Sequence, residues 1–246
     1  MSASPSPNAR APGAPLSIVV PTLQAAKALG PCLGAIGEGL MAGLVAELII
    51  ADGGSDDGIG RVAEDLGATL IQAPRGRGTQ LAAGCAAARA PWLLIVHADT
   101  VLPADWPDAV MAHLRQHPGS AGYFGLAFDD PGWQARIVGG WANLRSRLFA
   151  LPYGDQALLV PRALYEAAGG YPEIPLMEDV SLVRAIVAIG GRGALRRLPG
   201  TVVTSAERYR RDGWWRRGAL NLSMLLRWRL GADPVALADR YRRGRS

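Results

Sequence analysis

The sequence predicts an α/β protein built on a parallel, doubly wound sheet, and three observations lead to this prediction. Residues 16–100 alternate short apolar segments with longer segments of helical spacing, in the order β-α-β-α-β-α-β. The last apolar segment, residues 92–96, is apolar at every position, which is typical of a strand buried on both faces. Three of the four segments end in a notable polar loop. Because parallel strands place their carboxyl ends at one edge of a sheet, where ligands bind, we expect a site there.

The first half of the chain supplies the elements of this pattern. Between the first two strands, apolar residues at positions 29, 32, 33, 36 and 40 have the spacing of a helix, which Gly30-Pro31 can interrupt or restart. Two further helices are expected to end near Gly67 and near Ala90. The four expected strands are short and apolar and lie at residues 16–21, 47–51, 69–72 and 92–96.

The second half continues with mixed elements and ends in a basic region. One long basic helix is expected at residues 207–230, and Asp233-Pro234 begins a last short helix. The other expected helices have apolar residues at helical spacing and lie at residues 105–117, 133–150, 163–168 and 178–190. The other expected strands are rich in apolar residues and lie at residues 121–128, 157–160 and 194–205. The expected organisation is a disordered leader at 1–15, a main domain at 16–205 and a basic helical extension packed on it at 206–246.

Composition limits the class of protein. Hydrophobic residues make up 49% of the 246 and charged residues 19%, enough for a sizeable core. The net charge of +5 is uneven, since residues 184–246 hold 15 basic and 4 acidic side chains. Such a segment suits anionic lipid or a phosphorylated substrate, and no recognition motif accompanies it that would indicate nucleic acid.

The cellular location of the protein is predicted from its cysteines, its leader and its longest apolar runs. The two cysteines lack CxxC spacing and fit buried thiols in a reducing compartment. The leader has no apolar region of a signal peptide, and no run of 18 apolar residues indicates a membrane span. We therefore expect a cytoplasmic protein, with residues 206–230 as a candidate for peripheral contact with the inner face of the membrane.

Candidate site residues follow the expected strands and also open one helix. Each type has an ordinary structural explanation, because Asp and Gly are common in turns, loop arginines are often solvated and acids favour the first turn of a helix. Asp155-Gln156 has a similar ambiguity between a sugar contact and a turn. The convergence of several such loops on one sheet edge favours a functional site. Its candidate residues are Pro21, Thr22, Asp52, Gly53, Ser55, Arg75, Gly76, Arg77, His97, Asp99, Glu178 and Asp179.

In their order and spacing these motifs resemble the family 2 glycosyltransferases, which have the GT-A fold, and the resemblance covers nearly all of residues 16–230. It implies that Asp52 contacts the nucleobase and that the basic loop at 75–78 lies near the nucleotide. It also implies that Asp99, at the end of an Asp-x-Asp-like motif, binds Mg²⁺ or Mn²⁺, and that Asp179 of the Glu178-Asp179 pair is the catalytic base. Its short motifs HAD, GDQ and EDV look similar to those of small bacterial arsenosugar-biosynthesis and radical-SAM/selenodomain-associated transferases.

Two departures from the family pattern matter. His97 stands where many members have the first acid of Asp-x-Asp, and it can take only part of that acid's role. The Gln-x-x-Arg-Trp motif of processive members is replaced by residues 207–211, ERYRR, so polymer synthesis is not implied.

The chemistry expected of such residues agrees with the resemblance. A leaving diphosphate gains negative charge, which a carboxylate-bound divalent cation offsets, and the acceptor hydroxyl must lose its proton to a base. Asp99 and Asp179 fit these roles, and attack from the face opposite the leaving group gives inversion. The expected partners are a nucleotide-diphosphate sugar and an acceptor that is either a small molecule or lipid-linked. The alternative is a catalytically degraded sugar-nucleotide-binding or membrane-surface-binding protein.

Competing enzyme classes lack their signatures. A dinucleotide-dependent dehydrogenase needs GxGxxG after the first strand, and a sugar-phosphate nucleotidyltransferase needs a Gly-rich basic loop there. The segment PTLQAAKALG has neither.

Overall fold

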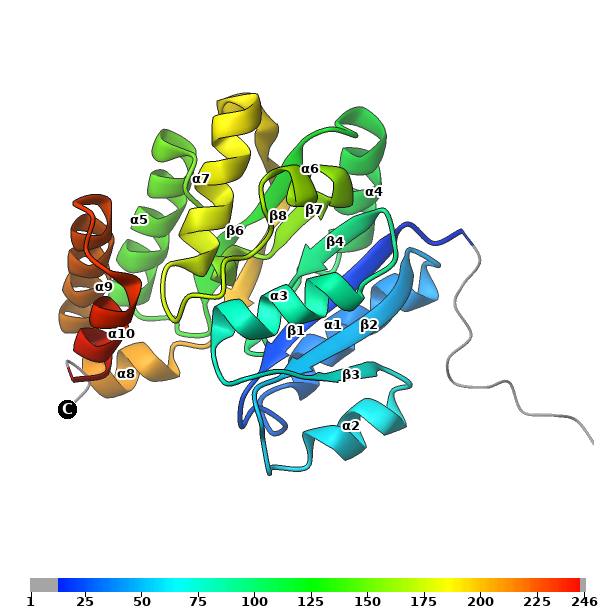
Figure 1. The fold of residues 1–246 in the computed structure, drawn as a ribbon, viewed down its shortest axis with the longest axis horizontal. Helices are drawn as coiled ribbons and strands as arrows, with labels where there is room; N and C mark the ends of the chain where they lie inside the picture. The colour runs from blue at the N-terminus through cyan, green and yellow to red at the C-terminus, as the bar shows by residue number, and fades with distance from the viewer. Residues whose placement is uncertain (1–12, 244–246) are drawn as a thin grey trace, which may run out of the picture.

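The computed structural model describes residues 13–243, which form an α/β structure around one eight-stranded sheet (Figure 1). The strand order is β3-β2-β1-β4-β7-β6-β8-β5. The pairs β3–β2, β2–β1, β1–β4 and β6–β8 are parallel, whereas β7 runs antiparallel to both β4 and β6. The strands are β1 Leu16–Thr22, β2 Val45–Asp52, β3 Thr69–Gln72, β4 Trp92–Ile95, β5 Thr100–Val101, β6 Ala121–Phe128, β7 Leu158–Pro161 and β8 Leu195–Thr204. The predicted α/β class with a mostly parallel sheet is thus confirmed. Most of the expected leader, residues 1–12, lies outside the described residues.

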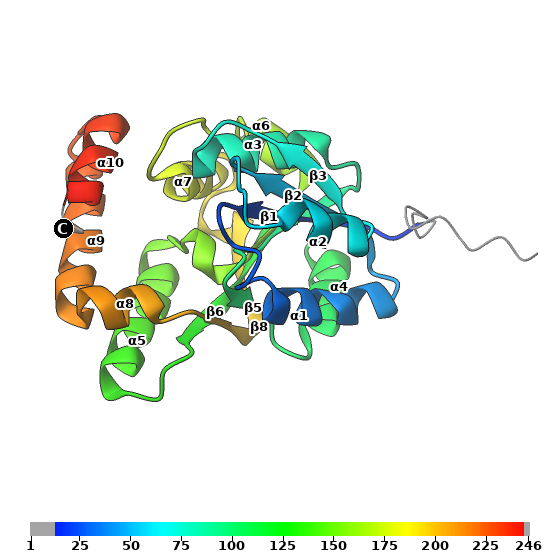
Figure 2. The ribbon, with the colours of Figure 1, turned by 90° about the horizontal axis from the view of Figure 1, so that it is seen from below.

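Helices cover both faces of the sheet, as a doubly wound fold requires. Figure 2 shows α3, α6 and α7 on one side and α1 and α4 on the other. A hydrophobic core lies on each face of the sheet. Alternate residues of β1 pack into the two cores, with Ile18 and Val20 in one and Val19 in the other. The helices are α1 Gly30–Met41, α2 Ile59–Asp65, α3 Arg77–Ala87, α4 Trp106–Gln116, α5 Trp133–Phe149, α6 Arg162–Ala167, α7 Glu178–Gly190, α8 Glu207–Asp212, α9 Trp214–Arg229 and α10 Pro234–Arg243. Within residues 13–243, no helix is both long and apolar enough to cross a membrane.

The expected helix after β1 begins at Gly30, where the sequence allowed for a break or a restart. Gln24 has a left-handed backbone with φ 52°, and its N–H donates to the Ser55 hydroxyl over 2.8 Å. The N–H of Ala26 donates to Asp57 over 2.7 Å. These long-range bonds hold the segment before Gly30 as a loop, and the helix starts where Pro31 is tolerated in the first turn. The acidic loop after β2 therefore shapes the loop after β1.

The expected single helix at 207–230 is two helices. Gly213, with φ 84°, separates α8 from α9, because a left-handed residue cannot continue a right-handed helix. The turn directs α9 along the side of α5, and a second turn after Arg229 places α10 against α9 (Figure 1). The short strand β5 was not expected, since two residues carry no periodicity.

Candidate active site

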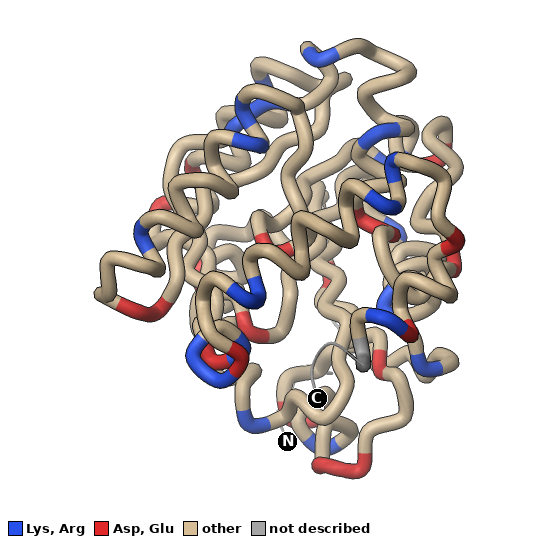
Figure 3. The backbone as a smooth tube through the Cα atoms, turned by 90° about the vertical axis from the view of Figure 1, so that its left-hand side faces the viewer, with Lys and Arg blue, Asp and Glu red and all other residues tan. Residues whose placement is uncertain are grey.

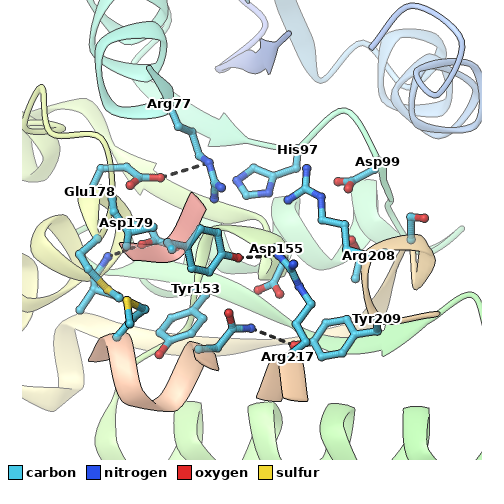
Figure 4. Close-up of a pocket in the computed structure, with 18 of the residues that line it drawn as sticks. Arg77, His97, Asp99, Tyr153, Asp155, Glu178, Asp179, Arg208, Tyr209 and Arg217 are labelled. Carbon is cyan, nitrogen blue, oxygen red and sulfur yellow. Dashed lines mark hydrogen bonds and ion pairs between the residues drawn. The ribbon is translucent and has the colours of Figure 1, made fainter. Parts of the chain in front are cut away.

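An open cleft lies at the carboxyl ends of β1 and β4, and it has two connected chambers. The outer chamber has a volume of about 830 Å³ and the inner chamber about 140 Å³. Arg77, His97, Asp99, Arg208 and Tyr241 line both, so these residues form the boundary between the chambers. Figure 4 shows Arg77, His97, Asp99 and Arg208 around the inner chamber. A ligand that spans this boundary would contact residues from β4, α3 and the C-terminal helices together.

Most of the residues expected at the site reach this cleft. The outer chamber is lined by Pro21, Thr22, Arg75, Gly76, Arg77, His97 and Asp99. The inner chamber adds Glu178 and Asp179. Asp52, Gly53 and Ser55 line neither chamber. Nine of the twelve candidate residues therefore line this cleft, whereas the three from the end of β2 and its loop do not.

Asp52 faces into its own loop. Its carboxylate is fully buried and accepts hydrogen bonds from the hydroxyls of Thr22 and Ser55 and from the N–H groups of Gly54 and Ser55, over 2.6 to 2.9 Å. Burial raises the pKa of this carboxyl, but these hydrogen bonds outweigh burial and the pKa lies below its usual range. All four donors would compete with a ligand for its oxygens. In this structure Asp52 shapes the wall behind the outer chamber, and its contact with a nucleobase stays a prediction.

Gln80 joins the ends of β1 and β2 from α3. Its side-chain amide donates to the carbonyl oxygens of Thr22 and Ala51. A Cβ at Gly53 would lie 3.0 Å from this amide, so the loop after β2 needs a small residue at that position. Gly53 therefore contributes close packing to the site.

Asp99 is held by the pairing of β5 with β8. Its carbonyl oxygen accepts the N–H of Ser205 over 3.2 Å, and the next residue, Thr100, pairs with Thr204. The Asp99 side chain lies on the wall of both chambers. Among the described residues, no group of three or more His, Cys, Asp or Glu side chains is placed to hold a metal ion. A single carboxylate nevertheless suits Mg²⁺ or Mn²⁺, since such ions take most ligands from water and from substrate phosphates.

His97 is a neutral side chain packed beside Gly154. Burial lowers the pKa of the imidazole to about 3, with Arg77 and Arg208 acting in the same direction and Asp179 opposing them. Its Nε2 is buried without a hydrogen-bond partner and lies 2.6 Å from where a Cβ on Gly154 would be. His97 thus brings no negative charge to the position that an acid occupies in the family motif.

Glu178 and Asp179 begin α7 and point into the inner chamber (Figure 4). The Asp179 oxygens accept the N–H groups of Gly154 and Val180, each over 2.7 Å. Each carboxylate oxygen can accept more than one hydrogen bond, so Asp179 is oriented without being saturated. Its carboxylate is thus held in a fixed orientation on the wall of the inner chamber.

Arg77 connects α3 to α7. Its Nε lies 3.3 Å from Oε1 of Glu178, whose side chain is 2% exposed. A Cβ at the neighbouring Gly78 would collide with the carbonyl oxygen of Pro172, so α3 packs directly on the loop that leads into α7. This close approach brings the basic loop after β3 to the acids of α7.

The buried Glu178 should make stability depend on pH. Burial raises its pKa from 4.5 to about 7, with Arg77 opposing and Asp179 adding to the rise. Because the folded protein holds this proton more tightly, the stabilisation is complete below the unfolded pKa and is lost as the pH rises through about 7. Glu178→Gln should therefore be more stable than the parent at ~pH 8, by up to about 3 kcal/mol, and lose this advantage at ~pH 4. Urea unfolding at both pH values measures the difference.

The exposed Glu173 in the loop before α7 provides the matched control, and Glu173→Gln should show no such pH dependence. If the free energies of unfolding of Glu178→Gln and the parent differ by the same amount at both pH values, the raised pKa of Glu178 is contradicted.

Asp155 is a site residue that the sequence left ambiguous. Burial raises its pKa to about 6, with Arg145 opposing and Asp179 and Asp99 adding to the rise, and its Oδ1 is buried without a hydrogen-bond partner. Gln156 beside it is structural, since its amide donates to Phe124 and accepts from Ser146. The sequence indicated this position through the motif Gly154-Asp155-Gln156. Only the fold shows that Asp155 lines the chamber whereas Gln156 is structural.

The C-terminal helices complete the cleft. Arg208 of α8 and Tyr241 of α10 line both chambers. Arg217 of α9 is 3% exposed and joins these helices through bonds to Asp212 and to the Tyr241 hydroxyl. Periodicity alone gave no signal for these residues, because their positions depend on how α8, α9 and α10 pack against one another and the sheet edge.

The chain is similar to known glycosyltransferases in sequence and in fold. A model of the family described as Glycosyl transferase family 2 matches residues 17–150. Solved structures of glucosyl-3-phosphoglycerate synthase from Mycobacterium tuberculosis superpose with a TM-score of 0.57 at 19% identity. One, with Mn²⁺, UDP and phosphoglyceric acid, covers 78% of this chain and 69% of that chain. Another, with Mn²⁺, UDP-glucose and phosphoglyceric acid, covers 78% and 71%.

A mycobacterial protein of known structure is similar to the same degree, with a TM-score of 0.56 at 21% identity over 81% of this chain and 68% of that chain. No curated protein sequence matches the chain.

Proposed function

The chain belongs to glycosyl transferase family 2 and is a glycosyltransferase, and we propose that it moves a sugar from a nucleotide-diphosphate donor to an acceptor hydroxyl, with inversion and with a divalent cation. The observation that carries this proposal is the arrangement of the two chambers. Arg75 lines the outer chamber, Asp179 lines the inner one, and Asp99, His97 and Arg77 lie on the boundary between them. A leaving group and a base thus have places on opposite sides of one boundary.

The outer chamber suits the nucleotide diphosphate. Arg75 and Arg77 supply guanidinium groups, which bind phosphate oxygens bidentately. Asp99 would hold Mg²⁺ or Mn²⁺, and the cation would offset the charge that develops on the diphosphate as it leaves. The structures of glucosyl-3-phosphoglycerate synthase contain Mn²⁺ with UDP or UDP-glucose, which supports a donor and cation of this class.

The inner chamber suits the acceptor. In the proposed step, the acceptor oxygen bonds to the anomeric carbon while the bond from that carbon to the diphosphate oxygen breaks. Asp179 takes the acceptor proton, and its orientation by Gly154 and Val180 fixes the oxygens for this transfer. Attack from the side of Asp179, with departure toward Asp99, inverts the anomeric configuration.

A sugar-nucleotide-binding protein without catalysis is the alternative, and the neutral His97 in place of an acid is the observation that favours it. The retained Asp179 favours the enzyme, because binding alone needs no base. A cytoplasmic location is part of our proposal. The narrower likeness to arsenosugar-biosynthesis and selenodomain-associated transferases stays a prediction, since it depends only on short motif wording.

The proposal is tested by thermal stability in the presence of UDP-, GDP-, dTDP- and CMP-sugars, each with Mn²⁺ and with EDTA. We expect one nucleotide family to stabilise the fold with Mn²⁺ by roughly 2.7 kcal/mol at about 100 times its dissociation constant, and EDTA to remove most of this gain. Mn²⁺ without donor is the control. A folded sample that no donor stabilises would contradict the proposed donor site.

A further inference from the structure

Helix α5 exposes its large apolar side chains to solvent. Its buried face consists mainly of small residues, including Ala135, Gly139 and Ala142, which let the helix lie close to β6. The exposed side carries an apolar stripe in which every member is at least 45% exposed and the spacing is that of one helix face. The stripe consists of Trp133, Ile137, Trp141, Leu144 and Leu148, with Phe149 at the end of the helix. These side chains contribute little to the core.

Helix α9 carries a second stripe of the same kind beside the first. Its members are 43 to 88% exposed and are Trp215, Leu222 and Leu226, with Leu230 just beyond the helix. The rings of Trp133 and Trp215 lie 5.7 Å apart, so the two stripes meet at their first turns. Together they contain ten of the sixteen large apolar side chains exposed within residues 13–243. An apolar surface this concentrated indicates a contact surface.

Arginines accompany the stripes, and acids do not. Helices α5 and α9 contain seven arginines and no Asp or Glu. Arg145 and Arg217 are buried, whereas the remaining five, Arg136, Arg147, Arg216, Arg227 and Arg229, are exposed. Figure 3 views the side of the molecule that carries these helices. The two helices thus combine tryptophan, leucine and arginine and contain no acid, a composition complementary to the interface of an anionic bilayer.

A slot between the two helices leads from this surface to the catalytic chamber. It has a volume of about 260 Å³, and Trp141 and Phe149 of α5 and Leu222 and Leu226 of α9 form its apolar walls. At its inner end, Tyr153, Asp155, Tyr209, Phe128 and Asn221 line both the slot and the inner chamber. Figure 4 shows Tyr153, Asp155 and Tyr209 at this junction. An apolar chain in the slot would therefore present its polar end to the inner chamber.

We propose that the acceptor is a membrane lipid, taken from an anionic bilayer on which the stripes of α5 and α9 dock. Its hydrocarbon chain lies in the slot and its hydroxyl reaches the inner chamber beside Asp155 and Asp179. The lipid oxygen would gain the bond to the anomeric carbon, the diphosphate would leave with the electron pair, and the proton would go to Asp179. The acceptor role rests on the proposed function, whereas docking and chain binding do not.

Docking is tested by sedimentation with vesicles of phosphatidylglycerol and of phosphatidylcholine. We expect binding to phosphatidylglycerol that weakens at high salt, and little binding to phosphatidylcholine. Leu226→Glu should lower the affinity for phosphatidylglycerol vesicles about tenfold, which corresponds to losing the burial of one leucine. Leu40→Glu is the matched control, because Leu40 lies on α1 with 49% exposure against 52% for Leu226. No vesicle binding, or equal losses in both variants, would overturn the docking surface.

The slot is tested by photo-crosslinking with phosphatidylglycerol vesicles that contain a trace of lipid with a diazirine in its acyl chain. Peptides of α5 and α9 should be labelled. Gly218 lies in the slot wall with no atom within 4 Å of an added Cβ, so Gly218→Leu should fill the slot. It should remove labelling of buried slot residues such as Leu225, while labelling of the exposed stripes and vesicle binding persist. Gly37→Leu, at an equally open position of α1, is the control. Labelling outside α5 and α9, or unchanged labelling in Gly218→Leu, would overturn the proposal.

The experiments can contradict the proposed donor site and the proposed lipid acceptor independently of each other. A protein that is stabilised by a donor and Mn²⁺ but binds no vesicles keeps the donor site and loses the lipid acceptor. A protein that binds vesicles and is labelled in the slot, yet responds to no donor, retains a lipid-binding surface and loses the proposed donor site.

Discussion

Asp179→Asn is expected to lower the rate of sugar transfer by about 10²–10⁴-fold, the usual contribution of a positioned general base. The amide retains the size of the side chain and one oxygen for the Gly154 N–H, but it has no basic oxygen to take the acceptor proton. Donor binding should persist, because Asp179 lies on the inner chamber and not on the outer one. Donor turnover, measured as release of nucleoside diphosphate, together with the thermal shift by donor and Mn²⁺, checks both halves of this prediction.

Glu173→Gln makes the same chemical change in an exposed residue of the loop before α7 and should leave turnover unchanged. Normal turnover in Asp179→Asn would remove Asp179 from the role of base and direct attention to Asp155, whose pKa of about 6 leaves it largely ionised at neutral pH. An equal loss in both variants would indicate a structural effect of the loop instead.

Asp99→Ala is expected to abolish transfer and to remove the part of donor binding that depends on Mn²⁺. Asp99 supplies the carboxylate on the wall between the chambers, and no group of three potential ligands elsewhere in residues 13–243 replaces it. With the carboxylate gone, the thermal shift that a donor produces with Mn²⁺ should fall to its value with EDTA. The Arg75 and Arg77 contacts should preserve the shift that remains in EDTA.

Asp65→Ala is the control, since Asp65 is an exposed acid at the end of α2. A full Mn²⁺-dependent shift in Asp99→Ala would show that the cation is held by other residues. Loss of the shift both with Mn²⁺ and with EDTA would assign Asp99 to direct contact with the donor.

Most of the fold could be predicted from local patterns of apolar residues in the sequence. The expected strands at 69–72 and 121–128 and the helix at 178–190 have the same bounds in the structure. These segments could be predicted because burial on one or both faces imposes a periodicity on neighbouring residues. The single helix expected at 207–230 was wrong, because Gly213 divides it into α8 and α9. Before α1, the bond from Gln24 to Ser55 in the loop after β2 holds a loop conformation that no local pattern indicates.

Two residues of the candidate site show the same division. Asp99 follows a buried strand, so its place at the sheet edge could be predicted from its neighbours in the sequence. The sequence named Asp52 as well, but its carboxylate turns inward to four donors, two of them the N–H groups of Gly54 and Ser55. The backbone direction that presents those donors is a property of the folded loop.

The sequence by itself determined the α/β class, the polar loops at the strand ends and the family to which their order points, because these depend on spacing along the chain. The tertiary structure alone decided which side of each element faces a ligand. Helix α5 was expected to be amphipathic, and its pattern does not reveal that its small residues are buried while large ones such as Trp133 and Trp141 face solvent. A helix pattern defines two faces, and only packing against β6 selects the one that is covered.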